Sequence, residues 1–296
     1  MVNQEKIEEI FDIINEGCSF LYEKRKSNYL DSVLMVTVNI MDSNSIDIED
    51  EFLDEYMVII NKFSNQYKVE EVRKALQYVI LNAFKEIRYD NQITPDSVVV
   101  IFSYLVDKLY GKRELTILDP MIGSANLLMG IANNRENSLL YGIDNEEIMI
   151  KLAKMMGDMI EPINLYFQDT LKVRLKNMDL IVSDVPCDVT LTYNVIDYHL
   201  DSLVDNGYMI LLVDNEFFTQ INEEKRKRIN AVSTMLGIIE LPEEFFKQKR
   251  KSIVIIKKSI EKVEKFLLAK MPNINDLEKM NNFIRKIEQW FINGGK

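Results

Sequence analysis

The chain has 296 residues, of which 47% are hydrophobic and 28% are charged, so a disordered or fibrous protein is excluded. No apolar run approaches the roughly 18 residues that a membrane span needs, and the acidic, amphipathic N-terminus is not typical of a signal peptide. The two cysteines, Cys18 and Cys187, are too few for a disulfide framework or a metal cluster, so we expect a cytoplasmic protein without either.

The net charge of -11 is unevenly distributed along the chain. Residues 1–60 hold 14 acidic and 4 basic residues, whereas residues 222–258 hold 10 basic and 5 acidic ones. Because phosphate contacts supply most non-specific affinity for nucleic acid, this balance disfavours autonomous DNA binding. The basic runs at 225–228 and 247–251 are more simply interpreted as solvated faces. The acidic N-terminal segment is a candidate docking surface for a protein partner.

Residues 1–90 are predicted to form a helical N-terminal subdomain. Apolar residues recur at helical spacing in three runs, at 7–14, 52–63 and 72–84, and polar loops are expected at 41–45 and 64–68. No cluster of Pro and Gly marks a flexible linker, so we expect these helices to pack against the region that follows.

Strands and helices alternate from Thr94 onward. Thr94 is a predicted N-cap for a helix over 96–109, with Pro95 just inside its start. Strands are predicted at 115–118, 139–143, 164–167, 180–183, 208–213, 237–241 and 252–257, and further helices around 198–204 and at 275–293. The short link between the last two strands is typical of a hairpin, so we expect an antiparallel last strand on an otherwise parallel α/β sheet. The predicted units are residues 1–90, 91–260 and a helical tail at 261–296.

An acidic residue follows each of the first four predicted strands, namely Asp119, Asp144, Asp169 and Asp184. The carboxyl ends of parallel strands meet at one edge of a sheet. A carboxylate about 20 residues past a glycine loop, here the loop of Gly123, is typical of a residue that holds a nucleotide ribose. Each Asp alone could be a helix N-cap, but acids on successive strand ends favour a nucleotide cofactor.

Six motifs in this order resemble those of class I S-adenosylmethionine (SAM) methyltransferases, and among them the N6-adenine-specific DNA methyltransferases. The motifs are ITPDSV from Ile93, LDPMIGSANLL from Leu118, GID from Gly142, QDTL from Gln168, MDLIVSDVP from Met178 and IIELPEEFF from Ile238. The chain is similar to the small bacterial proteins of the YtxK-like group, which resemble the modification subunit of type I restriction systems. The resemblance covers about residues 90–258, and more weakly the N-terminus. It implies a Rossmann-like sheet of seven strands with an antiparallel last strand.

The resemblance also implies roles for individual residues. The cofactor-binding residues would be Thr94, Pro95, Asp119, Pro120, Gly123, Ser124, Asp144 and Asp169. Within this set, Asp119 and the Gly123 loop would lie along the methionine part of SAM, and Asp144 would hold the ribose. Asp169 would accept a hydrogen bond from the adenine amino group of SAM. The motif that holds the target base in the family is matched by residues 184–187, so Asp184 and Pro186 are the candidate catalytic residues.

The chemistry of N6-adenine methylation explains that motif. The exocyclic amine of adenine is a poor nucleophile because its lone pair is delocalised into the ring. An Asp or Asn side chain and a backbone carbonyl that accept its two hydrogens would localise the lone pair, while an aromatic residue stacks on the flipped base. Alignment and electrostatics then suffice, without a metal.

The chain departs from the family pattern in the fourth motif, in the glycine loop (residues 121–125) and in the short segment 188–194 that follows the fourth motif. Val185 replaces the first proline of the fourth motif, Cys187 replaces its aromatic residue, and Ala125 replaces a loop glycine, which is a mild change if φ is negative there. Stacking on an aromatic residue is worth about 1–3 kcal/mol per base, so its loss weakens adenine capture.

Two alternatives to N6-adenine methylation therefore stay open. One is a SAM-binding but catalytically degenerate protein with a regulatory or scaffolding role. The other, ranked lower, is an RNA cytosine-C5 methyltransferase that would use Cys187 as a thiolate nucleophile, which requires a lowered pKa. The single histidine, His199, is expected at the surface or half-buried rather than in a catalytic role.

Overall fold

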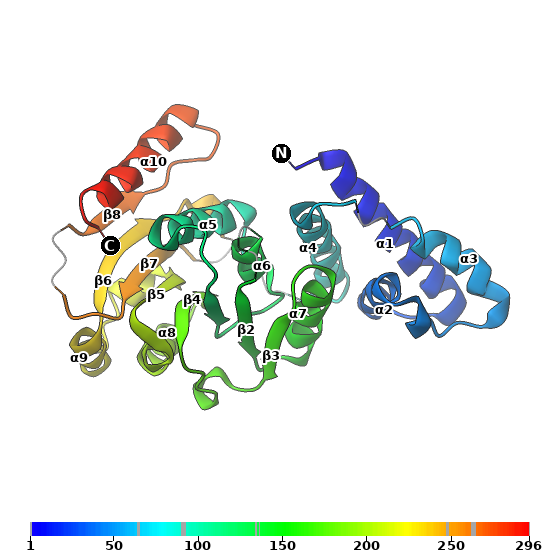
Figure 1. The fold of residues 1–296 in the computed structure, drawn as a ribbon, viewed down its shortest axis with the longest axis horizontal. Coiled ribbons are helices and arrows are strands. Elements are labelled where there is room, and N and C mark those ends of the chain that lie inside the picture. Colours follow the sequence, from blue (N-terminus) through cyan, green and yellow to red (C-terminus); the bar gives the residue numbers. More distant parts are fainter. Residues whose placement is uncertain are drawn as a thin grey trace.

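The computed structural model describes residues 2–63, 66–89, 93–133, 135, 137–246, 249–261 and 265–295. Four N-terminal helices extend beyond one edge of a layered α/β domain (Figure 1). They are α1 (Gln4–Arg25), α2 (Tyr29–Met41), α3 (Asp50–Ile60) and α4 (Val69–Glu86). Of these, α2 was not among the predicted runs, because its buried residues include the polar Ser32, Thr37 and Asn39, which interrupt an apolar stripe.

The first predicted loop of this region is present, since α2 ends at Met41 and a 3-10 turn covers Ser43–Ser45. The second, at 64–68, lies partly outside the described residues. Helices α2 and α4 contact the α/β domain through α7, and α4 also contacts α6.

The described residues form one sheet of eight strands in the order β3-β2-β1-β4-β5-β7-β6-β8, rather than the seven strands expected. The strands are β1 (Thr116–Asp119), β2 (Leu139–Asp144), β3 (Ile163–Phe167), β4 (Met178–Asp184), β5 (Leu203–Asp214), β6 (Thr234–Glu240), β7 (Lys251–Lys257) and β8 (Leu267–Lys270). As predicted, β7 is antiparallel to its neighbours β5 and β6. The additional strand, β8, pairs in parallel with β6 at the sheet edge, so the stretch after residue 260 is not purely helical.

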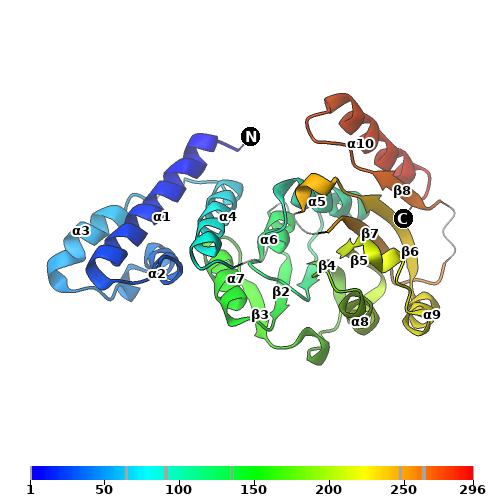
Figure 2. The ribbon, with the colours of Figure 1, turned by 180° about the vertical axis from the view of Figure 1, so that it is seen from behind.

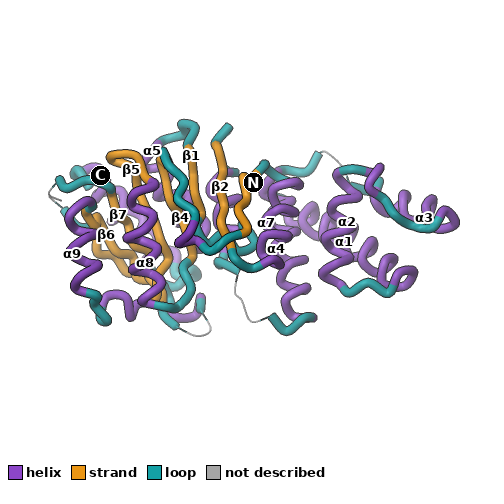
Figure 3. Tube along the Cα trace, turned by 90° about the horizontal axis from the view of Figure 1, so that it is seen from below, coloured by secondary structure: helices purple, strands orange, loops and turns teal. Residues whose placement is uncertain are grey.

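Helices cover both faces of the sheet (Figures 2 and 3). One face packs against α5 (Asp96–Tyr110), α6 (Asn126–Ala132), α7 (Glu147–Met159) and α10 (Leu277–Ile292), and the other against α8 (Val189–His199) and α9 (Glu223–Val232). Successive strand residues alternate between the two faces, as Leu180 and Ile181 do. No helix in the described part of the chain is long and apolar enough to cross a membrane.

The helix predicted at 198–204 lies earlier in the chain than expected. Asp188 caps α8 by accepting a hydrogen bond from the Leu191 amide at 2.9 Å, so the helix begins at Val189. A 3-10 turn over Leu200–Ser202 follows, and β5 already begins at Leu203.

Candidate active site

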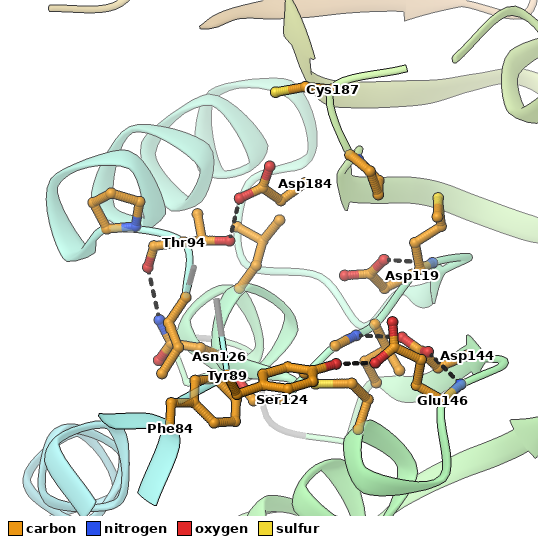
Figure 4. A pocket seen from close by; sticks show the side chains of 18 of the residues that line it. Phe84, Tyr89, Thr94, Asp119, Ser124, Asn126, Asp144, Glu146, Asp184 and Cys187 are labelled. Carbon is orange, nitrogen blue, oxygen red and sulfur yellow. Dashed lines mark hydrogen bonds between the residues drawn. The ribbon is translucent and has the colours of Figure 1, made fainter. Parts of the chain in front are cut away.

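A cavity of about 550 Å³ opens at the carboxyl ends of three neighbouring parallel strands. The last residues of β2, β1 and β4 are Asp144, Asp119 and Asp184, and all three line it (Figure 4). This volume is within the range of about 300–1,000 Å³ that small-molecule sites occupy. The strand order therefore brings together carboxylates that lie up to 65 positions apart in the sequence.

Most of the residues predicted from the sequence line this cavity, namely Thr94, Pro95, Asp119, Gly123, Ser124, Asp144, Asp184 and Pro186. Pro120 is buried and is not part of the lining. Asp169 is also outside the lining: its carboxylate caps the 3-10 turn Thr170–Lys172 by accepting from the Leu171 amide at 2.9 Å.

Asp119 is completely buried at the end of β1. Its Oδ1 accepts hydrogen bonds from the Ser183 hydroxyl at 2.7 Å and from the Met121 amide at 3.0 Å. Its Oδ2 has no hydrogen-bond partner among the described residues. Burial raises the pKa of Asp119 to about 7, because a desolvated carboxylate is costly, and the nearby Asp144 and Asp184 add to the rise. A cationic donor in the cavity would satisfy this oxygen and stabilise the ionised form.

Asp144 organises the loop between β1 and α6. Its Oδ2 accepts from the Gly123 amide and its Oδ1 from the Glu146 amide, both at 2.9 Å. Burial raises its pKa, although these hydrogen bonds oppose the rise. Gly123 has a φ of 53°, a left-handed conformation that glycine adopts without a steric penalty. The Glu146 carboxylate, which sequence reasoning did not single out, also lines the cavity and accepts from the Tyr89 hydroxyl.

The replacement of a loop glycine by Ala125 was expected to be mild only with a negative φ, but the backbone there has a positive φ. Its φ is 66°, so this non-glycine residue adopts the left-handed conformation immediately before α6. Such a conformation costs an L-residue roughly 1–2 kcal/mol. The loop therefore has the backbone conformation of a turn with glycine at this position, and the left-handed conformation of Ala125 is strained.

Both oxygens of Asp184 have partners. Its Oδ2 accepts from the Thr94 hydroxyl at 2.9 Å, so Thr94 contacts the fourth motif instead of capping α5, whose N-cap is Pro95. Its Oδ1 accepts from Lys251 Nζ at 2.5 Å, and the same Nζ donates to the Val185 carbonyl at 2.9 Å. The basic run that contains Lys251 was predicted to be a solvated face, but this residue is only 9% exposed and lines the cavity. Its position at the start of an apolar strand was the overlooked signal.

A buried polar network connects the cavity to the N-terminal helices. Asn126 donates from Nδ2 to the Thr94 carbonyl at 3.0 Å and accepts at Oδ1 from Arg73 Nη1 at 2.5 Å. Arg73, on α4, is 1% exposed and pairs with Glu70 at 2.6 Å and with Asp96 at 3.1 Å. Sequence reasoning missed both, because Arg73 belongs to no recognised motif and Asn126, although part of the motif that begins at Leu118, was assigned no role.

The surroundings of Cys187 and His199 do not favour a catalytic role for either residue. Cys187 lines the cavity, but burial raises the pKa of its thiol, whereas a nucleophilic cysteine needs a lowered one. His199 is completely buried, which corrects the expectation of a surface or half-buried residue, and it lies outside the cavity lining. Its Nε2 is 2.8 Å from the Thr170 hydroxyl, and burial lowers its pKa to about 4.

Comparisons of the sequence find a family model that matches the N-terminal helices and a relative that covers most of the chain. Residues 8–84 match the family model of the YtxK N-terminal helical domain. An uncharacterised protein of Bacillus subtilis, YtxK, is 22% identical over an alignment that covers 95% of this chain and 96% of the relative. This similarity extends the resemblance from the motifs to the N-terminal helices.

Solved structures share the fold. The chain resembles a putative class I SAM-dependent methyltransferase of Listeria monocytogenes with a TM-score of 0.83 at 24% identity, over 98% of this chain and all of the other. It resembles a modification subunit of a putative type I restriction enzyme from Vibrio vulnificus with a TM-score of 0.59 at 14% identity, over 82% of this chain and 62% of that one. The fold is therefore that of the class I SAM-dependent methyltransferases, as the motifs implied, with a helical N-terminal region.

Proposed function

We propose that the protein binds SAM in the cavity at the ends of β1, β2 and β4 and transfers its methyl group to an amine of a nucleic acid, DNA rather than RNA. The observation that carries the proposal is Asp119 Oδ2, a buried carboxylate oxygen that lines the cavity and has no partner among the described residues. Buried polar atoms are normally hydrogen-bonded, so an unpaired one supports a bound donor. The ammonium of SAM is such a donor.

The residues present fit this cofactor. Asp119 would accept from its ammonium, Asp144 would hold the ribose hydroxyls with its remaining lone pairs, and the Gly123 loop would lie along the methionine part. Bound SAM supplies an electrophilic methyl group on a sulfonium. Asp184, which lines the cavity, and the Val185 carbonyl would accept the two hydrogens of a target amine once Lys251 Nζ, which donates to both, has moved away. The restriction-modification structures that share the fold support DNA as the substrate class.

Calorimetric titration with SAM and with its demethylated product, S-adenosylhomocysteine, tests cofactor binding. We expect Asp119→Ala and Asp144→Ala each to weaken SAM binding by at least about tenfold. Asp119→Ala removes the hydrogen bond to the charged ammonium, and Asp144→Ala removes the bonds to the two ribose hydroxyls. Asp205→Ala, which changes an exposed carboxylate of β5, should bind like the unaltered protein. No heat of binding by the unaltered protein would contradict the proposal.

A second candidate function is a SAM-binding protein with a regulatory or scaffolding role. The ion pair of Asp184 with Lys251, together with Val185 and Cys187 in the fourth motif, favours it. Incubation with labelled SAM and mixed DNA and RNA separates the two candidates. Transfer to either nucleic acid supports the enzyme, and SAM binding without transfer supports the second candidate.

Cysteine-based cytosine methylation has less support, since the raised pKa of Cys187 keeps its thiol protonated. A cytoplasmic location and the docking of a protein partner on the acidic helices α1 to α3 stay predictions.

A further inference from the structure

Lys251 is a buried lysine whose ammonium lies inside the cavity. It is the first residue of β7, and its side chain is 11% exposed. Nζ donates to Asp184 Oδ1 at 2.5 Å and to the Val185 carbonyl at 2.9 Å, and it lies 5.9 Å from the centroid of the Phe246 ring. The ammonium thus has a carboxylate, a carbonyl and an aromatic ring around it.

The sheet fixes the lysine in this place. Lys251 pairs with Asp214, the last residue of β5, and β5 lies next to β4, whose last residue is Asp184. Because β7 is antiparallel, its first residue lies at the same edge as the last residues of β4 and β5.

The contacts of Lys251 are those that a target amine would need. An amine that receives a methyl group here would donate its two hydrogens to the Asp184 carboxylate and the Val185 carbonyl, and both already accept from Nζ. The other carboxylate oxygen accepts from Thr94 at 2.9 Å. Two nitrogen atoms cannot occupy one position, so an external amine can bind only after Nζ leaves.

We propose that Lys251 occupies the position of the target amine in the free protein, so that an external amine can bind there for methylation only when it displaces Nζ. The inference rests on the proposed function, because it takes Asp184 and the Val185 carbonyl as the amine acceptors. Lys249, the other lysine of the lining, does not compete for them, since it pairs with Asp214 at 3.1 Å and Glu216 at 3.2 Å.

Equilibrium dialysis of labelled adenosine against protein saturated with S-adenosylhomocysteine tests the proposal, since saturation prevents adenosine from occupying the cofactor position. We expect the unaltered protein to retain no adenosine above background. Lys251→Met, whose side chain is one atom shorter and carries no donor, should bind adenosine at least about tenfold more tightly, as expected for acceptors that gain two hydrogen bonds.

Lys257→Met is the matched control. Lys257 is on the same strand and the same face, and its side chain is 14% exposed, but it lies at the opposite end of β7, outside the cavity lining. We expect it to retain no more adenosine than the unaltered protein. If Lys251→Met fails to fold by circular dichroism, Lys251→Gln, whose neutral amide ends one atom short of the Nζ position, takes its place.

Each outcome decides the proposal. Equal retention by the unaltered protein and the folded Lys251 variant overturns it, and so does the absence of retention by both. Binding of S-adenosylhomocysteine is measured in the same samples. Its absence from the unaltered protein would contradict the proposed function, whereas its presence with no effect of Lys251 would contradict only this inference.

Discussion

Two buried titratable side chains, Asp119 and His199, have pKa values that burial moves in opposite directions. The pKa of Asp119 is raised to about 7 and that of His199 is lowered to about 4. Between these limits the folded protein holds a proton on Asp119 that the unfolded chain has lost, so this residue makes stability fall as pH rises. Conversely, the folded protein lacks a proton on His199 that the unfolded chain holds below pH about 6.5, so this residue makes stability fall as pH decreases.

Separate substitutions should reveal these opposing contributions. We expect His199→Gln, whose amide can still bond to Thr170, to leave a protein that loses stability from pH 5 to pH 7. Asp119→Asn should leave one that gains stability over the same interval, each change being on the order of 1–3 kcal/mol. Urea unfolding, followed by the fluorescence of Trp290, the single tryptophan, measures both. If both variants keep the pH dependence of the unaltered protein, the burial argument is wrong.

Site residues were predictable from the sequence where their position at the end of a parallel strand is enough to place them in the cavity. Asp119, Asp144 and Asp184 converge because parallel strands place their carboxyl ends at one edge. Asp169 does not join them, because its carboxylate is used to cap a 3-10 turn after the edge strand β3. Lys251 was not predicted, because a run of basic residues usually lies on the surface. The register of β7 against β5 is what places it in the cavity.

At the scale of elements, the alternation of strands and helices was readable, but the last strand was not. Residues 267–270 are Leu, Leu, Ala and Lys, which are good helix formers and include no β-branched residue. They form β8 because the edge of β6 offers unpaired backbone groups and because α10 packs against β8. Tertiary pairing therefore overrides local preference here.

Trp290 connects α10 to the segment that immediately precedes β8. Its ring is 5% exposed, and its Nε1 donates to the Lys265 carbonyl at 2.7 Å. We expect Trp290→Ala to lower the free energy of unfolding by about 3–5 kcal/mol, because it leaves a cavity and an unpaired carbonyl. Trp290→Phe, which keeps most of the packing, should cost about 1–2 kcal/mol. Urea unfolding followed by circular dichroism measures both, and an Ala variant as stable as the Phe variant would contradict this role.

For the whole molecule, the sequence predicted a helical N-terminal region and an α/β domain but not how they join. That junction depends on Arg73 of α4, which forms ion pairs with Glu70 and Asp96 and donates to Asn126 of α6. A buried arginine between two regions has no sequence signature, since its partners are 3, 23 and 53 positions away. Through the Asn126 bond to the Thr94 carbonyl, the same residue connects the helices to the cavity.

Replacement of Arg73 should therefore affect both stability and ligand binding. We expect Arg73→Met to lower the free energy of unfolding by about 3–5 kcal/mol, because it leaves the partly buried Glu70 without its cation and Asp96 with only the longer pairing to Lys74. It should also weaken SAM binding several-fold, because Asn126 loses the partner that orients it toward Thr94.

Lys74→Met is the control: this neighbour is 3.5 Å from Asp96 but its side chain is 30% exposed, and it should change either quantity little. Urea unfolding and calorimetric titration measure the two effects, and a folded Arg73→Met protein with unaltered SAM affinity would show that the N-terminal helices stabilise the domain without shaping its site.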